Sequence, residues 1–450
     1  MVNKHRLVLV ILYKKEDKNK KKRKEIQMKK YAILWIFLIS FLGLDAQHFD
    51  HFFENRTLRI NYLHIGNNNS EKIEIDSYYQ GEGWTGTREY LVEEQRYGDM
   101  LFEVFDASSQ KLIFSKDYNC LFTEYRSTER AEKEVGKFEE CMLLPYPKAK
   151  INYRFSSFTR SHQKTVLYEG SFDPQKESVK PYTKEYKVLN LHKGGNPEEC
   201  VDILFIPDGY SKADKKILKA DMKKFADYII NCAPYDEYKN NINIRAIEGY
   251  SEESGITDPN ANIYKNTLLN SSYNVIDVDR YLMCLNVWKM NDIAEDAPYD
   301  VIIIVANSPK YGGGGIYNFY ATVNSIGQHS DYVIVHELGH LFGGLADEYY
   351  NSEVSVRDFY PENVEPAEPN LTTMIDFASK WKDMLSAEVP VPTPDNKKYD
   401  NTLGVFEGGG YVAEGVFRPW RDCTMKDIKY NNFCPVCKKV LAEKIKKFSK

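Results

Sequence analysis

The chain has 450 residues, of which 42% are hydrophobic and 28% are charged, so it is globular rather than disordered or collagen-like. Its length is sufficient for two or three domains, each with a hydrophobic core. Twelve Lys and Arg against four acids give the first 46 residues a charge of +8; since the whole chain carries −5, the other 404 residues carry −13. This acidic body excludes nucleic acid as the partner, because phosphate binding needs a cationic surface.

The first predicted element is a targeting signal. Tyr31–Leu44 is uncharged over 14 residues, two lysines precede it, and a small residue stands before Gln47. This pattern is typical of a secretory signal peptide, and it is shorter than the roughly 20 residues that span a bilayer as a helix. Residues 1–46 are therefore predicted to be an N-terminal extension and signal peptide, with the natural start at Met28. The mature chain is then exported, to an extracellular or periplasmic location, without stable membrane insertion. The alternative is a cytoplasmic tail on a short membrane anchor.

Short alternating segments fill residues 47–185 and predict an all-β, sandwich-like domain. Leu58–Tyr62 and Lys72–Ile75 have the period of two that is typical of half-buried strands. Asp106–Gln110 separates two apolar runs and predicts a hairpin, and Ile151–Phe155 continues the alternation. No constellation of catalytic residue types is found in this domain.

Beyond residue 185 the pattern changes to strands that alternate with helices, which predicts an α/β domain over residues 186–450. Ser211 is predicted to cap a helix, with Asp214 three residues later as in a capping box. Val301–Ala306 is almost wholly apolar, as a central parallel strand is. The other predicted elements are strands at Val201–Ile206, Ile242–Ile247 and Ile316–Val323 and a helix around Val278–Ile293.

The segment His336-Glu337-Leu338-Gly339-His340 has the HExxH spacing. Residues four apart share one face of a helix, so His336 and His340 can direct two imidazoles at one metal ion. Glu337 is placed so that its carboxylate can act as general base on a water at the metal. The pattern predicts one catalytic Zn²⁺, which lowers the pKa of such a water to about 7.

A catalytic zinc site needs three protein ligands and an open position. The metzincin pattern HExxHxxGxxH supplies a third His after a glycine turn, but here Ala346 stands at that place and Asp347 follows. Because no His occurs after His340, a downstream third ligand must be a carboxylate. We predict Asp347, with Glu348 as the alternative ligand; a solvated turn or a partner that orients the histidines is the remaining interpretation. His329 is predicted to be a loop residue.

Three further features could serve such a site. Met425 is a candidate for a Met-turn, an apolar floor beneath the metal, although a single Met is more often core filling. The strand predicted at Ile316–Val323 precedes the helix, where zinc peptidases bind the substrate backbone as an added strand. Tyr349, Tyr350 and Tyr430 are candidate donors to a developing oxyanion, but none is singled out among 33 tyrosines.

Eight cysteines are compatible with disulfides in an exported protein. Cys120 with Cys141 could close a loop in the first domain. Cys434-Pro435-Val436-Cys437 has the spacing of a zinc ribbon or a redox pair, but a ribbon needs a second pair and only Cys423 is near. We therefore expect a structural disulfide that involves Cys423.

These motifs together resemble the bacterial IgA-peptidase family of zinc metallopeptidases. The resemblance rests on Ile206–Tyr210, His336–His340 with Leu345–Tyr349, Cys423–Met425 and Phe433–Cys437. It covers roughly residues 188–450, and the preceding region is similar to the β-rich N-terminal domain of related exported proteins. The resemblance implies a metzincin-like α/β (α+β) zincin fold, one catalytic zinc, and endopeptidase activity. It also implies that His336, His340 and Asp347 are ligands and that Glu337 is the base.

The sequence therefore predicts a secreted zinc endopeptidase that acts on a protein substrate. Immunoglobulin A is one candidate substrate, and other host, dietary or mucosal glycoproteins are another. A zincin-like binding module without catalysis is the alternative from a different class, and the intact Glu337 argues against it. Hydrolysis of a non-peptide amide would use the same residues. No EF-hand spacing for calcium is present.

Overall fold

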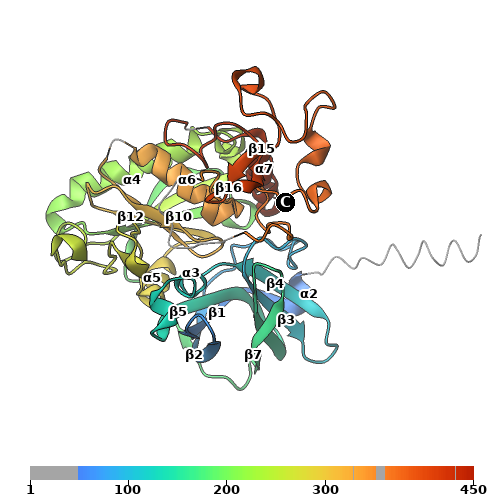
Figure 1. Ribbon diagram of the computed structural model, residues 1–450. Helices are drawn as coiled ribbons and strands as arrows, with labels where there is room; N and C mark the ends of the chain where they lie inside the picture. Colours follow the sequence, from blue (N-terminus) through green and yellow to red (C-terminus); the bar gives the residue numbers. More distant parts are fainter. Residues whose placement is uncertain (1–48, 328, 351–359, 431, 450) are drawn as a thin grey trace, which may run out of the picture. The chain divides into compact units, whose positions relative to one another are not determined.

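The computed structural model describes residues 49–450 except 328, 351–359, 431 and 450. The predicted signal peptide lies outside the described residues. Two four-stranded sheets follow the short helix α2 (Phe49–Phe52) (Figure 1). One has the order β5-β1-β2-β8 and the other the order β4-β3-β6-β7, and all their pairs are antiparallel except β2 with β8. The strands are β1 (Phe53–Gly66), β2 (Glu71–Gly81), β3 (Met100–Asp106), β4 (Leu112–Tyr118), β5 (Gly136–Pro147), β6 (Ile151–Phe158), β7 (Lys164–Phe172) and β8 (Val179–Pro181), with helix α3 (Leu121–Tyr125) between β4 and β5.

These two sheets share one hydrophobic core. Ile60 and Tyr62 from β1 and Met142 from β5 pack in the same cluster as Phe102 from β3 and Phe155 from β6. In β3 the buried residues Phe102 and Val104 alternate with less buried neighbours, as a period of two predicts. The half-buried strand predicted at Leu58–Tyr62 is instead buried on both faces, because Arg59 and Asn61 are buried too. The region is therefore β-rich, as predicted.

A six-stranded mixed sheet organises the rest of the chain, with the order β13-β14-β12-β10-β11-β9. Its four inner strands are parallel and its two edge strands antiparallel. The strands are β9 (Lys187–Lys193), β10 (Val201–Asp208), β11 (Ile242–Glu248), β12 (Val301–Ala306), β13 (Gly313–Gly315) and β14 (Ala321–Asn324). A separate hairpin joins β15 (Phe406–Gly409) to β16 (Val412–Arg418).

Helices cover both faces of the six-stranded sheet, which explains why its central strands are wholly apolar. Ile203 and Phe205 of β10 pack with helices α4 (Lys215–Ile230), α6 (Ser330–Gly343) and α7 (Pro435–Phe448). Leu204 and Ile206 of the same strand point the other way and pack with α5 (Val287–Ala294). This part of the chain is a mixed α/β layer structure, and Figure 1 shows α4 and α6 on the face opposite α5.

The structure corrects two predicted elements. The helix expected over Val278–Ile293 begins only at Val287, because Tyr281 instead forms a bridge with Gly313 and Arg280 O accepts from Gly313 N. The strand expected at Ile316–Val323 begins at Ala321, because the preceding residues turn, with Ile316 N bonded to Tyr320 O. The edge strand is instead the glycine segment β13.

Phe49 to Lys450 form one compact unit, and the division into domains at residue 185 stays a prediction. Among the described residues, no helix has the length and apolar character needed to cross a membrane.

Candidate metal centre and active site

Helix α6 carries the HExxH segment against the six-stranded sheet. Its apolar side chains, including Val333, Leu338 and Leu341, belong to the core cluster of that sheet. The helix is capped by Gly344, whose φ of 62° lies in the left-handed region that favours glycine, and Gly344 N donates to His340 O (3.0 Å). This cap turns the chain back toward the helix face that carries the two histidines.

The two imidazoles meet at their Nε2 atoms, which lie 3.1 Å apart. His336 Nδ1 donates to Thr424 O (2.9 Å) and His340 Nδ1 donates to Leu345 O (2.6 Å). A carbonyl only accepts, so each neutral ring carries its proton on Nδ1 and leaves the Nε2 lone pair free to bind a metal. The backbone thus fixes the tautomer that a metal ligand needs.

Asp347 completes a group of three ligand atoms. Its Oδ1 lies 3.1 Å from His336 Nε2 and 3.3 Å from His340 Nε2. That oxygen is buried and finds no hydrogen-bond donor among the described residues, while Oδ2 accepts from the Tyr411 hydroxyl (2.5 Å). Buried acceptors are normally satisfied. Three converging lone pairs, one on an orphaned carboxylate oxygen, fit a cation bound between them.

The electrostatics of the group His336, His340 and Asp347 also fit a bound cation. Burial opposes protonation of His340, but the Asp347 carboxylate outweighs it and raises the pKa of His340 to about 9. Burial also disfavours the charged form of Asp347, yet the two histidines hold the pKa of this carboxyl well below its usual range. The carboxylate therefore remains charged and attracts positive charge to this point, whether a proton or a metal ion.

Glu337 faces the glycine strand β13. Cβ atoms built at Gly313 and Gly315 would approach its carboxylate oxygens at 3.3 and 3.1 Å, and the one at Gly315 would also clash with Glu337 O at 2.4 Å. Only glycine allows the strand to pass this close to the helix. Burial raises the pKa of Glu337 above its ordinary value, which suits a carboxyl group that must take up a proton.

Comparison with known proteins identifies this arrangement. Residues 189–402 and 395–445 match the family model of IgA Peptidase M64, and residues 48–169 match that of the Peptidase M64 N-terminus. The chain belongs to the IgA peptidase M64 family. The resemblance found in the sequence is confirmed, and the protein is a metallopeptidase, a hydrolase whose substrates are proteins. No curated protein matches the chain.

The metallopeptidase has a cavity of about 290 Å³ in front of the histidines. Its lining includes Glu337, Arg280 and Tyr311 and also Glu124 and Arg160 from the β-rich N-terminal region. The hydroxyl of Tyr281 donates to the Glu124 carboxylate across this cavity. Apart from Glu337, sequence reasoning missed these lining residues, because none of the others is near HExxH in the chain. The one sequence signal was the run Gly312–Gly315, which ends 21 residues before His336.

The structure also locates the other candidate residues that the sequence suggested. Met425 is fully buried, and its Sδ lies 2.7 Å from where a Cβ at Gly339 would stand, so it packs under α6 between the two histidines. Tyr349 lines the cavity, whereas Tyr350 and Tyr430 are exposed and do not line it. His329 precedes the first residue of α6.

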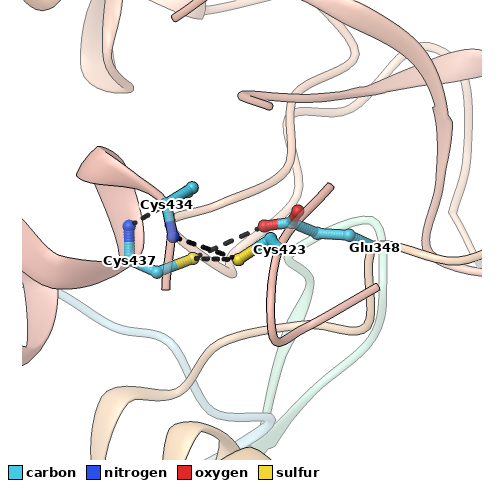
Figure 2. Close-up of side chains that lie close together, drawn as sticks. All are labelled: Glu348, Cys423, Cys434 and Cys437. Atoms are coloured by element: carbon cyan, nitrogen blue, oxygen red, sulfur yellow. Dashed lines mark hydrogen bonds between the residues drawn. The ribbon is translucent and has the colours of Figure 1, made fainter. Parts of the chain in front are cut away.

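Glu348 and the cysteines differ from what the sequence predicted, which was an alternative third metal ligand and disulfide bonds. Glu348, the alternative third ligand, does not belong to the group of the histidines; it lies in a group with Cys423, Cys434 and Cys437 (Figure 2). All eight cysteines are free thiols, so the disulfide expected at Cys423 is not formed, nor is one between Cys120 and Cys141. The Sγ atoms of Cys423 and Cys437 lie 3.9 Å apart, far beyond the length of a disulfide bond of about 2 Å.

Proposed function

We propose that this metallopeptidase is an exported, zinc-dependent endopeptidase with His336, His340 and Asp347 as ligands and Glu337 as general base. The observation that carries the proposal is the convergence of the two Nε2 lone pairs and the orphaned Asp347 Oδ1 within one cavity. Two imidazoles, one carboxylate and an open cavity side are the donor set of catalytic zinc in peptidases.

Zinc in this position would supply a Lewis acid that polarises the scissile carbonyl and acidifies water in the site. The protein residues perform the remaining steps. Glu337 takes the proton of the attacking water on a carboxylate oxygen and delivers it to the leaving amine. Thr424 O and Leu345 O hold the imidazoles in the ligating tautomer.

The substrate proposed is immunoglobulin A, as the family description suggests, or another host or mucosal glycoprotein. The cavity walls favour a polypeptide over a small amide. The glycine strand β13, Arg280 and Tyr311 line the same cavity, so an extended substrate would meet polar groups along this wall. Glu124 and Arg160 give the N-terminal region a part in this wall, and hence in substrate choice.

The test compares the wild-type protein with Glu337→Gln, which preserves the shape of the side chain and removes the base. Both are incubated with immunoglobulin A and with a mixed pool of glycoproteins, and cleavage sites are identified by mass spectrometry. We expect cuts by the wild type that the variant makes at least about 10²-fold more slowly, with unchanged metal content. Glu388→Gln, an exposed glutamate outside the cavity, is the matched control.

Two outcomes would contradict the proposal. Equal cleavage by both proteins would remove Glu337 from the mechanism. Bound zinc without any cleavage dependent on Glu337 would favour the non-catalytic binding module, and the same variant could then be used to capture a surface partner.

A further inference from the structure

A second group of ligand atoms lies behind the active site. Glu348, Cys423, Cys434 and Cys437 each offer one oxygen or sulfur atom, and all four atoms lie within 4.8 Å of one another (Figure 2). The four residues are buried, with exposed fractions from 0 to 3%. They come from three separate segments of the chain, so their meeting is a product of the fold and not of local sequence.

The distances fit a tetrahedral ion. Zinc–sulfur bonds of about 2.3 Å place two sulfur ligands about 3.8 Å apart and a sulfur and an oxygen ligand about 3.6 Å apart. Cys423 Sγ and Cys437 Sγ are 3.9 Å apart, and Cys437 Sγ is 3.4 Å from Glu348 Oε1. A disulfide would need two of these sulfurs to approach to about 2 Å and would leave the third thiol beside a carboxylate.

The backbone around the sulfurs is arranged to support negative charge. Cys434 N donates to Cys423 Sγ (3.2 Å), and Cys437 N lies 3.5 Å from Cys434 Sγ. Cys434 is also the N-cap of α7, a helix of 14 residues, so its sulfur lies at the positive end of the helix dipole. Amide donors and a helix N-terminus stabilise thiolates, which are the form of cysteine that binds metal.

The Glu348 carboxylate supplies an independent indication. Its Oε1 accepts from the Asn370 amide (3.0 Å), but Oε2 is buried and has no hydrogen-bond donor in the described part of the chain. The Arg418 guanidinium lies near enough to act on this carboxylate, but its hydrogen bonds go to Glu407 O, Gly408 O and Asp395. A buried carboxylate oxygen without a hydrogen-bond donor, beside three sulfurs, fits a ligand of a bound cation.

We propose that Glu348, Cys423, Cys434 and Cys437 bind a second metal ion, a structural Zn²⁺. Three thiolates and one carboxylate complete a closed tetrahedral site, and thiolate-rich, buried, four-donor sites select zinc among the divalent cations. The proposal does not depend on the identity of the catalytic ion.

This second site would hold in place the two loops that build the active site. Glu348 follows Asp347 directly, and its N–H donates to Met425 O (2.7 Å). Cys423 precedes Thr424, whose carbonyl orients His336. An ion that joins Glu348 to Cys423 would therefore fix both the carboxylate ligand and the partner of the first histidine.

The first experiment counts metal ions by plasma mass spectrometry on the full-length protein, purified with reductant and without chelator. We expect two zinc ions per chain in the wild type and one in His336→Ala/His340→Ala. Cys434→Ser/Cys437→Ser should also retain only one. Cys284→Ser, another fully buried cysteine outside the group, is the matched control and should retain two.

The second measurement tests the proposal even if the cysteine variants fail to fold. X-ray absorption at the zinc edge is measured on His336→Ala/His340→Ala, in which the cysteines are intact. It should show three sulfur ligands at about 2.3 Å and one lighter ligand. A zinc-free histidine variant, a shell of nitrogen and oxygen alone, or a disulfide among the three cysteines in the intact mass would overturn the proposal. If the proposed catalytic site binds no zinc, the sulfur shell should still be observed, so the two proposals can fail independently.

Discussion

Asp347 and Glu348 are neighbours in the chain, yet they serve two different groups of ligand atoms. Asp347 faces His336 and His340 at the floor of an open cavity, whereas Glu348 faces three cysteines in a sealed interior. The backbone explains this division. Asp347 O and Tyr349 O accept from the segment at Gly410, while Glu348 N donates to Met425 O in another segment.

In this way one short segment can combine catalysis with stability. An open site with imidazole and carboxylate ligands leaves a position for substrate, whereas a closed site with sulfur ligands leaves none. We therefore expect the first site to control activity directly, and the second to control stability and to affect activity only through the loops that it holds. The predictions below test that separation.

Selective metal removal should have the largest effect. A hydrophilic chelator reaches the open cavity first, so peptidase activity should fall to background, by at least about 10³-fold, with the loss of one ion per chain. The sealed ion should remain until the protein unfolds. Metal content, activity and circular dichroism followed together during chelation measure this, and added Zn²⁺ should restore activity. Simultaneous loss of both ions and of structure would refute the separation.

Replacing each of the two adjacent carboxylates by an amide should affect activity in one variant and stability in the other. Asp347→Asn should lower kcat/KM by at least about 10²-fold with little change in thermal stability, because the ligand lies at the cavity floor. Glu348→Gln should lower the free energy of unfolding by roughly 2–4 kcal/mol, because a buried ligand is lost. Steady-state kinetics and thermal unfolding of both variants give the comparison. Equal kinetic and thermal losses in the two variants would show that the groups act as one.

Removing one hydroxyl should give a smaller effect confined to the open site. The Tyr411 hydroxyl donates to Asp347 Oδ2, so Tyr411→Phe should weaken binding of the cavity ion by about 10- to 100-fold. Competition with a zinc-binding dye measures the change. Tyr430→Phe, which removes the hydroxyl of an exposed tyrosine, is the control and should bind metal as the wild type does. An unaltered affinity in Tyr411→Phe would mean that the bond does not orient the carboxylate.

The parts of this molecule that could be predicted from sequence are local ones. The strand Val301–Ala306 is observed with the predicted bounds, because a buried parallel strand must be apolar on both faces. The capping box of Ser211 and Asp214 is present, although a short 3₁₀ turn precedes the helix. The structure also brings Asp347 beside the two histidines, because a glycine cap reverses the chain within a few residues.

The parts that could not be predicted depend on contacts between distant segments. The Gly313–Gly315 strand reads as a loop in sequence, and only its close packing against Glu337 requires glycine. Cys423 and the Cys434–Cys437 pair suggested a disulfide because the fourth partner, Glu348, lies 75 residues before Cys423. The cavity wall from the N-terminal region has no motif at all, since Glu124 is one acid among 65.

A change in stability rather than in activity tests how far the open site extends into that region. Burial raises the pKa of Glu124 from 4.5 to about 7, against the hydrogen bond from Tyr281. Because the folded pKa exceeds the unfolded one, the folded state binds the proton more tightly, and this residue's contribution to stability falls as pH rises from 4.5 to about 7. In metal-free protein, Glu124→Gln should therefore become more stable relative to the wild type across this window, by roughly 3 kcal/mol at the upper end. Urea unfolding at several pH values measures the difference, and Glu89→Gln, an exposed glutamate of the same region, controls for the loss of one charge. A constant difference between variant and wild type over this range would show that Glu124 is not held in the low-dielectric wall of the cavity.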